Sequence, residues 1–70
     1  MSIIKIFRIK DGTKVGYVIV QFDLDTNKWV GKVEMSRPQF IGMVDVGLLE
    51  FRIEDTSKDK FEDWLITHAS

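Results

Sequence analysis

The first 22 residues constrain the fold most strongly, because two apolar runs are separated there by the dipeptide Asp11-Gly12. Residues 3 to 10 are rich in isoleucine, and residues 14 to 22 are rich in β-branched and aromatic side chains. Such side chains lose rotamer freedom in a helix and pack well on a pleated sheet. An Asp-Gly pair favours the tight turn of a β-hairpin. We therefore predict two antiparallel strands.

A third strand is predicted over residues 28 to 35, after a polar cluster typical of a turn at residues 23 to 27. Side chains of a regular strand alternate between the two faces of its sheet. This alternation would place Trp29, Gly31, Val33 and Met35 on one face, and Lys28, Val30, Lys32 and Glu34 on the other. The first half of the chain is thus expected to form a three-stranded antiparallel meander.

The second half predicts a short helix and a fourth strand. Ser36 resembles an N-cap with Pro38 in the first turn, which favours a helix near residues 37 to 45. Gly42 and the β-branched residues around it leave a strand as the alternative. Apolar and charged residues alternate over residues 48 to 54, so we expect a strand there.

A final helix is expected over residues 58 to 68. Thr56-Ser57 would cap it, and Asp59 would complement the helix dipole in the first turn. Helical spacing places four side chains on one face: Phe61, Trp64, Leu65 and His68. The predicted fold class is a small α+β domain over residues 1 to 70, with an antiparallel sheet and a C-terminal helix.

A chain of 70 residues has few ways to stabilise such a fold. A domain of this size buries only about 60% of the surface that its unfolded chain exposes. The sequence has no cysteine and one histidine, which excludes disulfides, zinc–thiolate sites and histidine-rich metal sites. Association with a partner is therefore one of the few stabilising contributions left.

The first two predicted strands are apolar on both faces. In the first strand, Ile3, Phe7 and Ile9 would lie on one face, with Ile4 and Ile6 on the other. We expect one or two short helices to cover one face of so small a sheet. The second face would then be enclosed by strong curvature of the sheet, or left as an apolar patch for another copy or another protein.

The residues give little support for catalysis or cofactor binding. His68 is expected to be a packed or frayed terminal side chain, and no serine lies in a Gly-x-Ser-x-Gly motif. The glycines form no phosphate-binding loop. A chain this short is also expected to lack a pocket of the usual volume, about 300–1,000 Å³. We therefore expect a protein that is not an enzyme and has no cofactor.

A partial calcium-loop pattern occurs in the second predicted turn. Positions 1, 3, 5 and 12 of the loop would be Asp23, Asp25, Asn27 and Glu34. Lys28 stands where the loop requires glycine, and the flanking residues predict strands instead of helices. An acidic β-turn explains the pattern, so no metal site is expected.

Nucleic-acid binding is the alternative function. The net charge is −1, with +2 on residues 1 to 35 and −3 on residues 36 to 70. Basic and aromatic side chains are interleaved in the first half, a combination used by single-stranded nucleic-acid binders. The predicted alternation does not gather them on one face, because Trp29 would lie opposite Lys28 and Lys32.

The favoured function is a non-catalytic protein-interaction domain, a small regulator, inhibitor or accessory subunit that binds a macromolecular partner through its sheet. Its candidate contact residues are Lys5, Phe7, Tyr17, Trp29 and Lys32. The expected partner is another protein or a second copy in a homodimer. An alternative acidic surface comprises Glu50, Glu54, Asp55, Asp59, Glu62 and Asp63.

A cytoplasmic location without membrane association is expected. The apolar run at the N-terminus is interrupted by Lys5 and Arg8. It therefore resembles neither a signal peptide nor a membrane-spanning segment.

Overall fold

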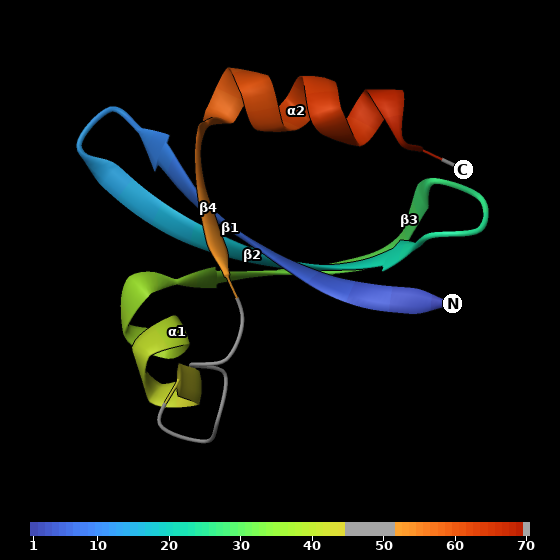
Figure 1. Ribbon diagram of the computed structural model, residues 1–70. Coiled ribbons are helices and arrows are strands. Elements are labelled where there is room, and N and C mark those ends of the chain that lie inside the picture. The colour runs from blue at the N-terminus through green and yellow to red at the C-terminus, as the bar shows by residue number, and fades with distance from the viewer. Residues whose placement is uncertain (45–51, 70) are drawn as a thin grey trace.

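The computed structural model describes residues 1–44 and 52–69 as a four-stranded sheet with two helices. The elements are β1 (Ser2–Asp11), β2 (Lys14–Asp23), β3 (Lys28–Ser36), α1 (Arg37–Val44), β4 (Ile53–Ser57) and α2 (Lys58–Thr67). The strand order across the sheet is β3-β2-β1-β4 (Figure 1). The predicted α+β class and the N-terminal meander are confirmed.

Both turns of the meander follow from residues that tolerate a left-handed backbone. Gly12 has a φ of 63° between β1 and β2, where a side chain would be strained. Asn27 has a φ of 59° between β2 and β3, and asparagine adopts this conformation more readily than most residues. The backbone N–H of Asp25 donates to the Asp23 carboxylate at 2.9 Å in the same turn.

The fourth strand differs from the sequence-based expectation in position and direction. It runs over Ile53–Ser57 and pairs parallel to β1, so the sheet is mixed. The expected strand over residues 48 to 54 overlaps it at Ile53 and Glu54, and residues 48 to 51 lie outside the described part of the chain. The chain passes through α1 between β3 and β4, which lie at opposite edges of the sheet. Such a crossover, unlike a tight hairpin, permits parallel pairing.

A β-bulge in β3 overturns the predicted alternation of its side chains. Gln21 pairs with Gly31, whereas Phe22 pairs with Trp29, so Val30 is an extra residue on β3. Because of this extra residue, the side chains of β3 that precede the bulge point to the opposite face of the sheet from the one that an unbroken alternation predicts. Trp29 therefore lies on the same face as Lys32, and not on the opposite one.

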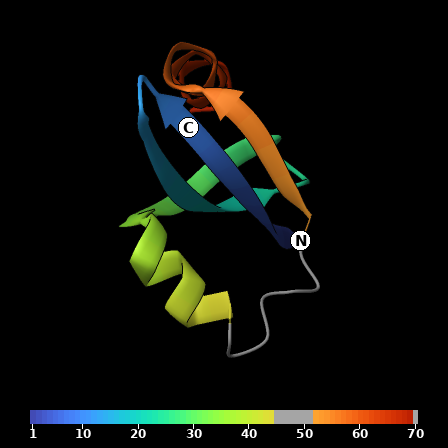
Figure 2. The same cartoon turned by 90° about the vertical axis from the view of Figure 1, so that its left-hand side faces the viewer.

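The two helices lie on opposite faces of the sheet (Figures 1 and 2), which corrects the expectation that they would cover one face only. Under α2, the buried cluster consists of Phe7, Val18, Val20 and Phe61. Under α1, the buried cluster consists of Ile6, Tyr17 and Phe40. Each face of the two-sided apolar sheet thus has a core of its own.

Both helices begin at the predicted caps. The backbone N–H of Ser36 donates to Gln39 Oε1 at 2.9 Å, and the backbone N–H of Gln39 donates in return to Ser36 Oγ. This reciprocal capping favours the helix over the alternative strand at residues 37 to 44. Ser57 accepts from the backbone N–H of Lys60 at 3.3 Å at the start of α2. The predicted apolar face of α2 is also confirmed, with Phe61 buried and Trp64, Leu65 and His68 half-buried.

Candidate interaction surfaces

The structure brings four of the five candidate contact residues to the face covered by α2. Phe7 is 4% exposed within the α2 core, and Lys5, Trp29 and Lys32 share its face. Tyr17 lies on the opposite face, 7% exposed, and its ring stacks on Phe40 with centroids 4.1 Å apart. Phe7 and Tyr17 could therefore contact a partner only if α2 or α1 moved away.

Trp29 joins β3 to the C-terminal end of α2. Its indole N–H donates to the Leu65 carbonyl at 2.8 Å, and its backbone N–H donates to the His68 carbonyl at 2.9 Å. The last carbonyls of a helix lack partners within the helix, so these two bonds satisfy groups that would otherwise need water. Trp29 thus has a structural role that the sequence pattern did not indicate.

The two candidate lysines have interactions within the chain. The Lys5 ammonium lies 5.4 Å from the centroid of the Phe22 ring, a cation–π distance. The Lys32 ammonium lies 3.6 Å from Glu34 Oε1 on the same strand. Binding of a partner by Lys5 and Lys32 stays a prediction.

An apolar row crosses the whole sheet on the face that carries α1. Strand pairing aligns Ile53, Ile6, Ile19 and Val33 across β4, β1, β2 and β3. Ile6 is 1% exposed, but the ends of the row are open, with Val33 at 59% and Ile53 at 38%. Ile4, which is 40% exposed, precedes Ile6 by two residues on β1 and so lies on the same face. We call Ile4, Ile19, Val33 and Ile53 the open face.

Sequence reasoning missed the open face because it gave weight to aromatic side chains. The alternation did place Ile4 and Ile6 together, which was the available signal. The position of Val33 was obscured by the bulge at Val30, because an unbroken alternation groups Val33 with Trp29.

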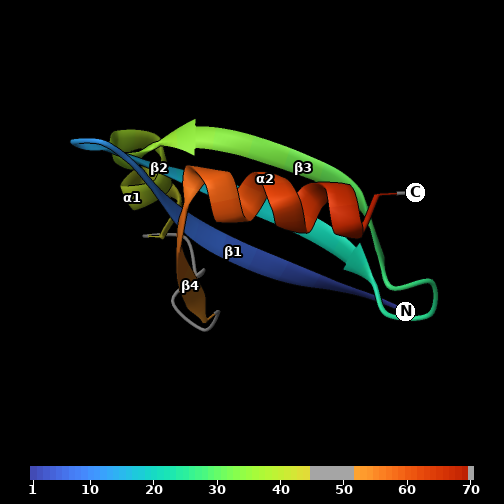
Figure 3. The same ribbon diagram turned by 90° about the horizontal axis from the view of Figure 1, so that it is seen from above.

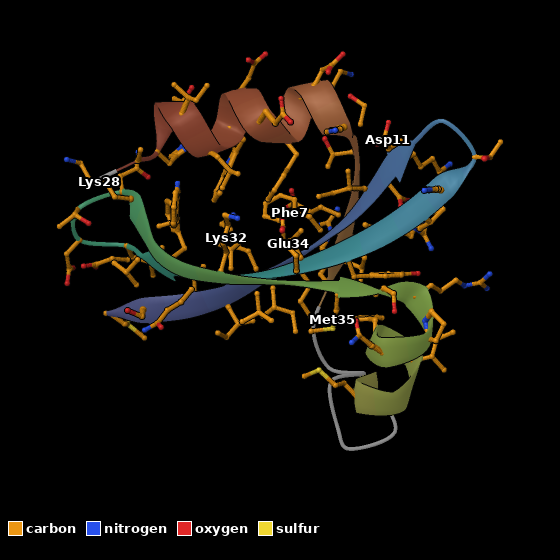
Figure 4. All side chains as sticks on the ribbon, turned by 180° about the vertical axis from the view of Figure 1, so that it is seen from behind. Phe7, Asp11, Lys28, Lys32, Glu34 and Met35 are labelled. Carbon is orange, nitrogen blue, oxygen red and sulfur yellow. The ribbon has the colours of Figure 1, made fainter. Side chains whose placement is uncertain are left out.

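A groove of about 530 Å³ lies between α2 and the β2–β3 side of the sheet, and it is open to solvent and not an enclosed cavity. Its apolar lining includes Ile9, Val18, Phe61 and Leu65. Two ion pairs within the chain border the groove, Lys58 with Asp11 at 3.7 Å and Lys32 with Glu34 at 3.6 Å. Figure 3 shows α2 running across the sheet. Figure 4 shows Lys32 and Glu34 on the α2 side of the sheet and Met35 on the α1 side.

A smaller hollow of about 320 Å³ lies on the α1 side and is basic. Its lining includes Arg8, Lys10, Arg37 and the ring of Tyr17. Arg8 donates twice to Asp55 on β4, with the Nη2–Oδ2 contact at 2.7 Å. These bonds lower the pKa of Asp55 and raise the pKa of Arg8 above its ordinary value.

Of the residues in the partial calcium-loop pattern, Asp23 and Asp25 share one turn, whereas Glu34 lies farther along the sheet. Asp23 lies at the end of β2, and the Asp25 N–H bond lowers the pKa of Asp23. Glu34 pairs with Val18, five positions earlier on β2 than Asp23. Among residues 1–44 and 52–69, no three histidine, cysteine or acidic side chains are grouped as metal ligands.

His68 is packed at the end of α2, whereas the acidic candidates lie on the surface. The ring of His68 packs on Trp64 and Phe22, at centroid distances of 4.7 and 5.6 Å, as a packed terminal side chain would. The described acidic candidates are exposed on β4 and α2: Glu54, Asp55, Asp59, Glu62 and Asp63. Asp55 accepts hydrogen bonds from Arg8, and Glu50 lies outside the described residues.

Comparison of the chain with protein-family models, curated proteins and solved structures finds no significant match. Neither described helix is long and apolar enough to cross a membrane. Any function must therefore be argued from the surfaces themselves.

Proposed function

We propose that this protein is a non-catalytic interaction domain, a small regulator, inhibitor or accessory subunit of the cytoplasm, that binds a protein partner through the open face of its sheet. The observation that carries this proposal is the apolar row from Ile53 to Val33, buried in the middle and exposed at both ends. Several exposed apolar side chains on one face of a sheet mark an interaction site more often than scattered single ones do.

The geometry suits a partner with an apolar anchor. The α1 core covers Tyr17 and the middle of the apolar row at Ile6, and leaves the two ends of that row open. Backbone pairing holds Ile4 and Val33 in place before any partner arrives, so little ordering entropy is lost on binding. Arg8 and Lys10 project from β1 on the same face and supply a basic edge to the site.

Surface variants test this proposal. We expect Ile4→Lys and Ile53→Lys to abolish capture of a partner from nuclease-treated lysate, because each places a charge within the apolar contact. Ile66→Lys is the matched control, since Ile66 is 76% exposed on α2, away from the open face. A photo-crosslinking residue at position 53, but not at position 66, should label the same partner. Equal capture by all three variants would contradict the proposal.

Single-stranded nucleic-acid binding is a second candidate, favoured by the basic hollow. Arg8, Lys10 and Arg37 converge there, and Asp55 neutralises one of the three charges. Affinity for single-stranded RNA or DNA should then fall steeply between low and physiological salt, and Arg37→Gln should reduce that dependence. Absence of binding at low salt would exclude this function.

A further inference from the structure

Among residues 1–44 and 52–69, the outer edge of β3 is closed by hydrogen bonds at both ends, and no backbone hydrogen bond closes it between them. At one end, the backbone N–H of Ser36 donates to Gln39 Oε1, and at the other, that of Trp29 donates to the His68 carbonyl. β3 is an edge strand, with β2 as its neighbour in the sheet. The stretch from Val30 to Met35 is therefore free of these two closures and presents an edge on which another strand could pair.

The two end bonds also fix which residues face outward along the backbone. In an antiparallel pair, residues alternate between bonding the neighbouring strand and pointing their N–H and C=O groups away from it. Ser36 points away from β2, so Glu34 and Lys32 do so as well. The bulge at Val30 shifts the alternation by one residue, which agrees with the outward N–H of Trp29.

This pattern restricts how a second copy could pair with the edge. Antiparallel self-pairing must place outward residues opposite outward residues. Centred on Lys32 it would oppose two lysines, and centred on Glu34 it would oppose two glutamates. Centred on Val33 it places Lys32 of each copy opposite Glu34 of the other, and opposite charges stabilise such cross-strand pairs.

We infer that β3 pairs antiparallel with β3 of a second copy about Val33, joining the two sheets edge to edge. Lys32 and Glu34 would exchange backbone hydrogen bonds across the interface and form ion pairs on the α2 face. Val33, 59% exposed, would meet Val33 of the second copy on the other face. The closed ends keep the interface short, so the dimer should be reversible.

This inference is independent of the proposed function, because it uses the strand edge and not the apolar face. Val33 belongs to both surfaces, so the test avoids it and uses Lys32 and Glu34. Their present ion pair lies within one chain, at 3.6 Å. A test must therefore separate pairing between copies from pairing within a copy.

Mixing two charge-reversal variants makes that separation. Analytical ultracentrifugation of the unaltered protein should show a monomer–dimer equilibrium at up to millimolar concentration. Lys32→Glu alone and Glu34→Lys alone should each weaken the dimer about tenfold, because each opposes like charges twice. An equimolar mixture of the two variants should associate again as a heterodimer, since glutamates of one copy then face lysines of the other.

Control variants carry the same charge changes elsewhere. Lys60→Glu on α2 and Glu54→Lys on β4, at the other sheet edge, should leave the dimer unchanged. Circular dichroism of every variant establishes that it is folded. Any one of three results would overturn the inference. The unaltered protein could be monomeric at millimolar concentration, the single variants could dimerise like the unaltered protein, or the mixture could fail to associate.

Discussion

The two faces of one sheet are covered to different extents. On the α2 face, Phe61 is buried, Trp64 and Leu65 pack beside it, and the helix is tied to β3 by Trp29. On the α1 face, Phe40 stacks on Tyr17, and the neighbouring apolar row stays partly exposed. This difference is the basis of the proposed roles, in which the α2 face stabilises the fold and the α1 face would bind the partner.

The largest effect is expected from Phe61→Ala. Phe61 is 4% exposed and its ring lies 4.9 Å from that of Phe7. Removing a buried phenylalanine costs about 3–5 kcal/mol, and a domain of this length has a total stability of about 4–10 kcal/mol. Urea denaturation followed by tryptophan fluorescence should show a midpoint lowered by about 1 M or more. A loss below about 1 kcal/mol would contradict the assignment of the main core to this face.

Phe40→Ala should have a smaller and more local effect. Its ring is 3% exposed, but α1 packs on one end of the sheet, so its release leaves the α2 core in place. We expect a loss of about 3 kcal/mol, at the low end for a buried aromatic residue. Nuclear magnetic resonance should show shifts at Tyr17 and Met35, with Trp64 unchanged. Global unfolding would show instead that the two cores are interdependent.

The sequence predicted the meander, both caps and the apolar face of α2, because each depends on neighbouring residues. Asp11-Gly12 determines its turn locally, and Ser57 caps its helix three residues away. The parallel β4 and the placement of the helices on opposite faces depend on where distant segments meet, which spacing does not encode. The bulge at Val30 is equally non-local, since it aligns Trp29 with a carbonyl of α2 at Leu65, far along the chain.

Trp29→Phe tests the connection between β3 and α2. The variant keeps an aromatic ring but removes the indole N–H that donates to Leu65. Loss of one such hydrogen bond costs about 1 kcal/mol, so the denaturation midpoint should fall modestly. Amide exchange at the last turn of α2 should accelerate, while exchange at Phe40 stays unchanged. Faster exchange in both helices would contradict a role confined to the α2 face.

The smallest effect is expected from Asp55→Asn, which alters the α1 face at the edge of the sheet. Arg8 lowers the pKa of Asp55 in the folded state, so ionised Asp55 stabilises the fold at pH values above the ordinary aspartate pKa, about 3.9. This contribution is lost as the pH falls from that value through the lower pKa of the folded state. At pH 7 the variant should therefore melt slightly below the unaltered protein, and the difference should vanish in acid.

Salt gives a second check on the same pair. Both side chains are exposed, so high salt should also reduce the difference in melting temperature. A difference that does not shrink as the pH falls below about 3.9 would show that the introduced amide disturbs packing, and that the pair does not act through charge.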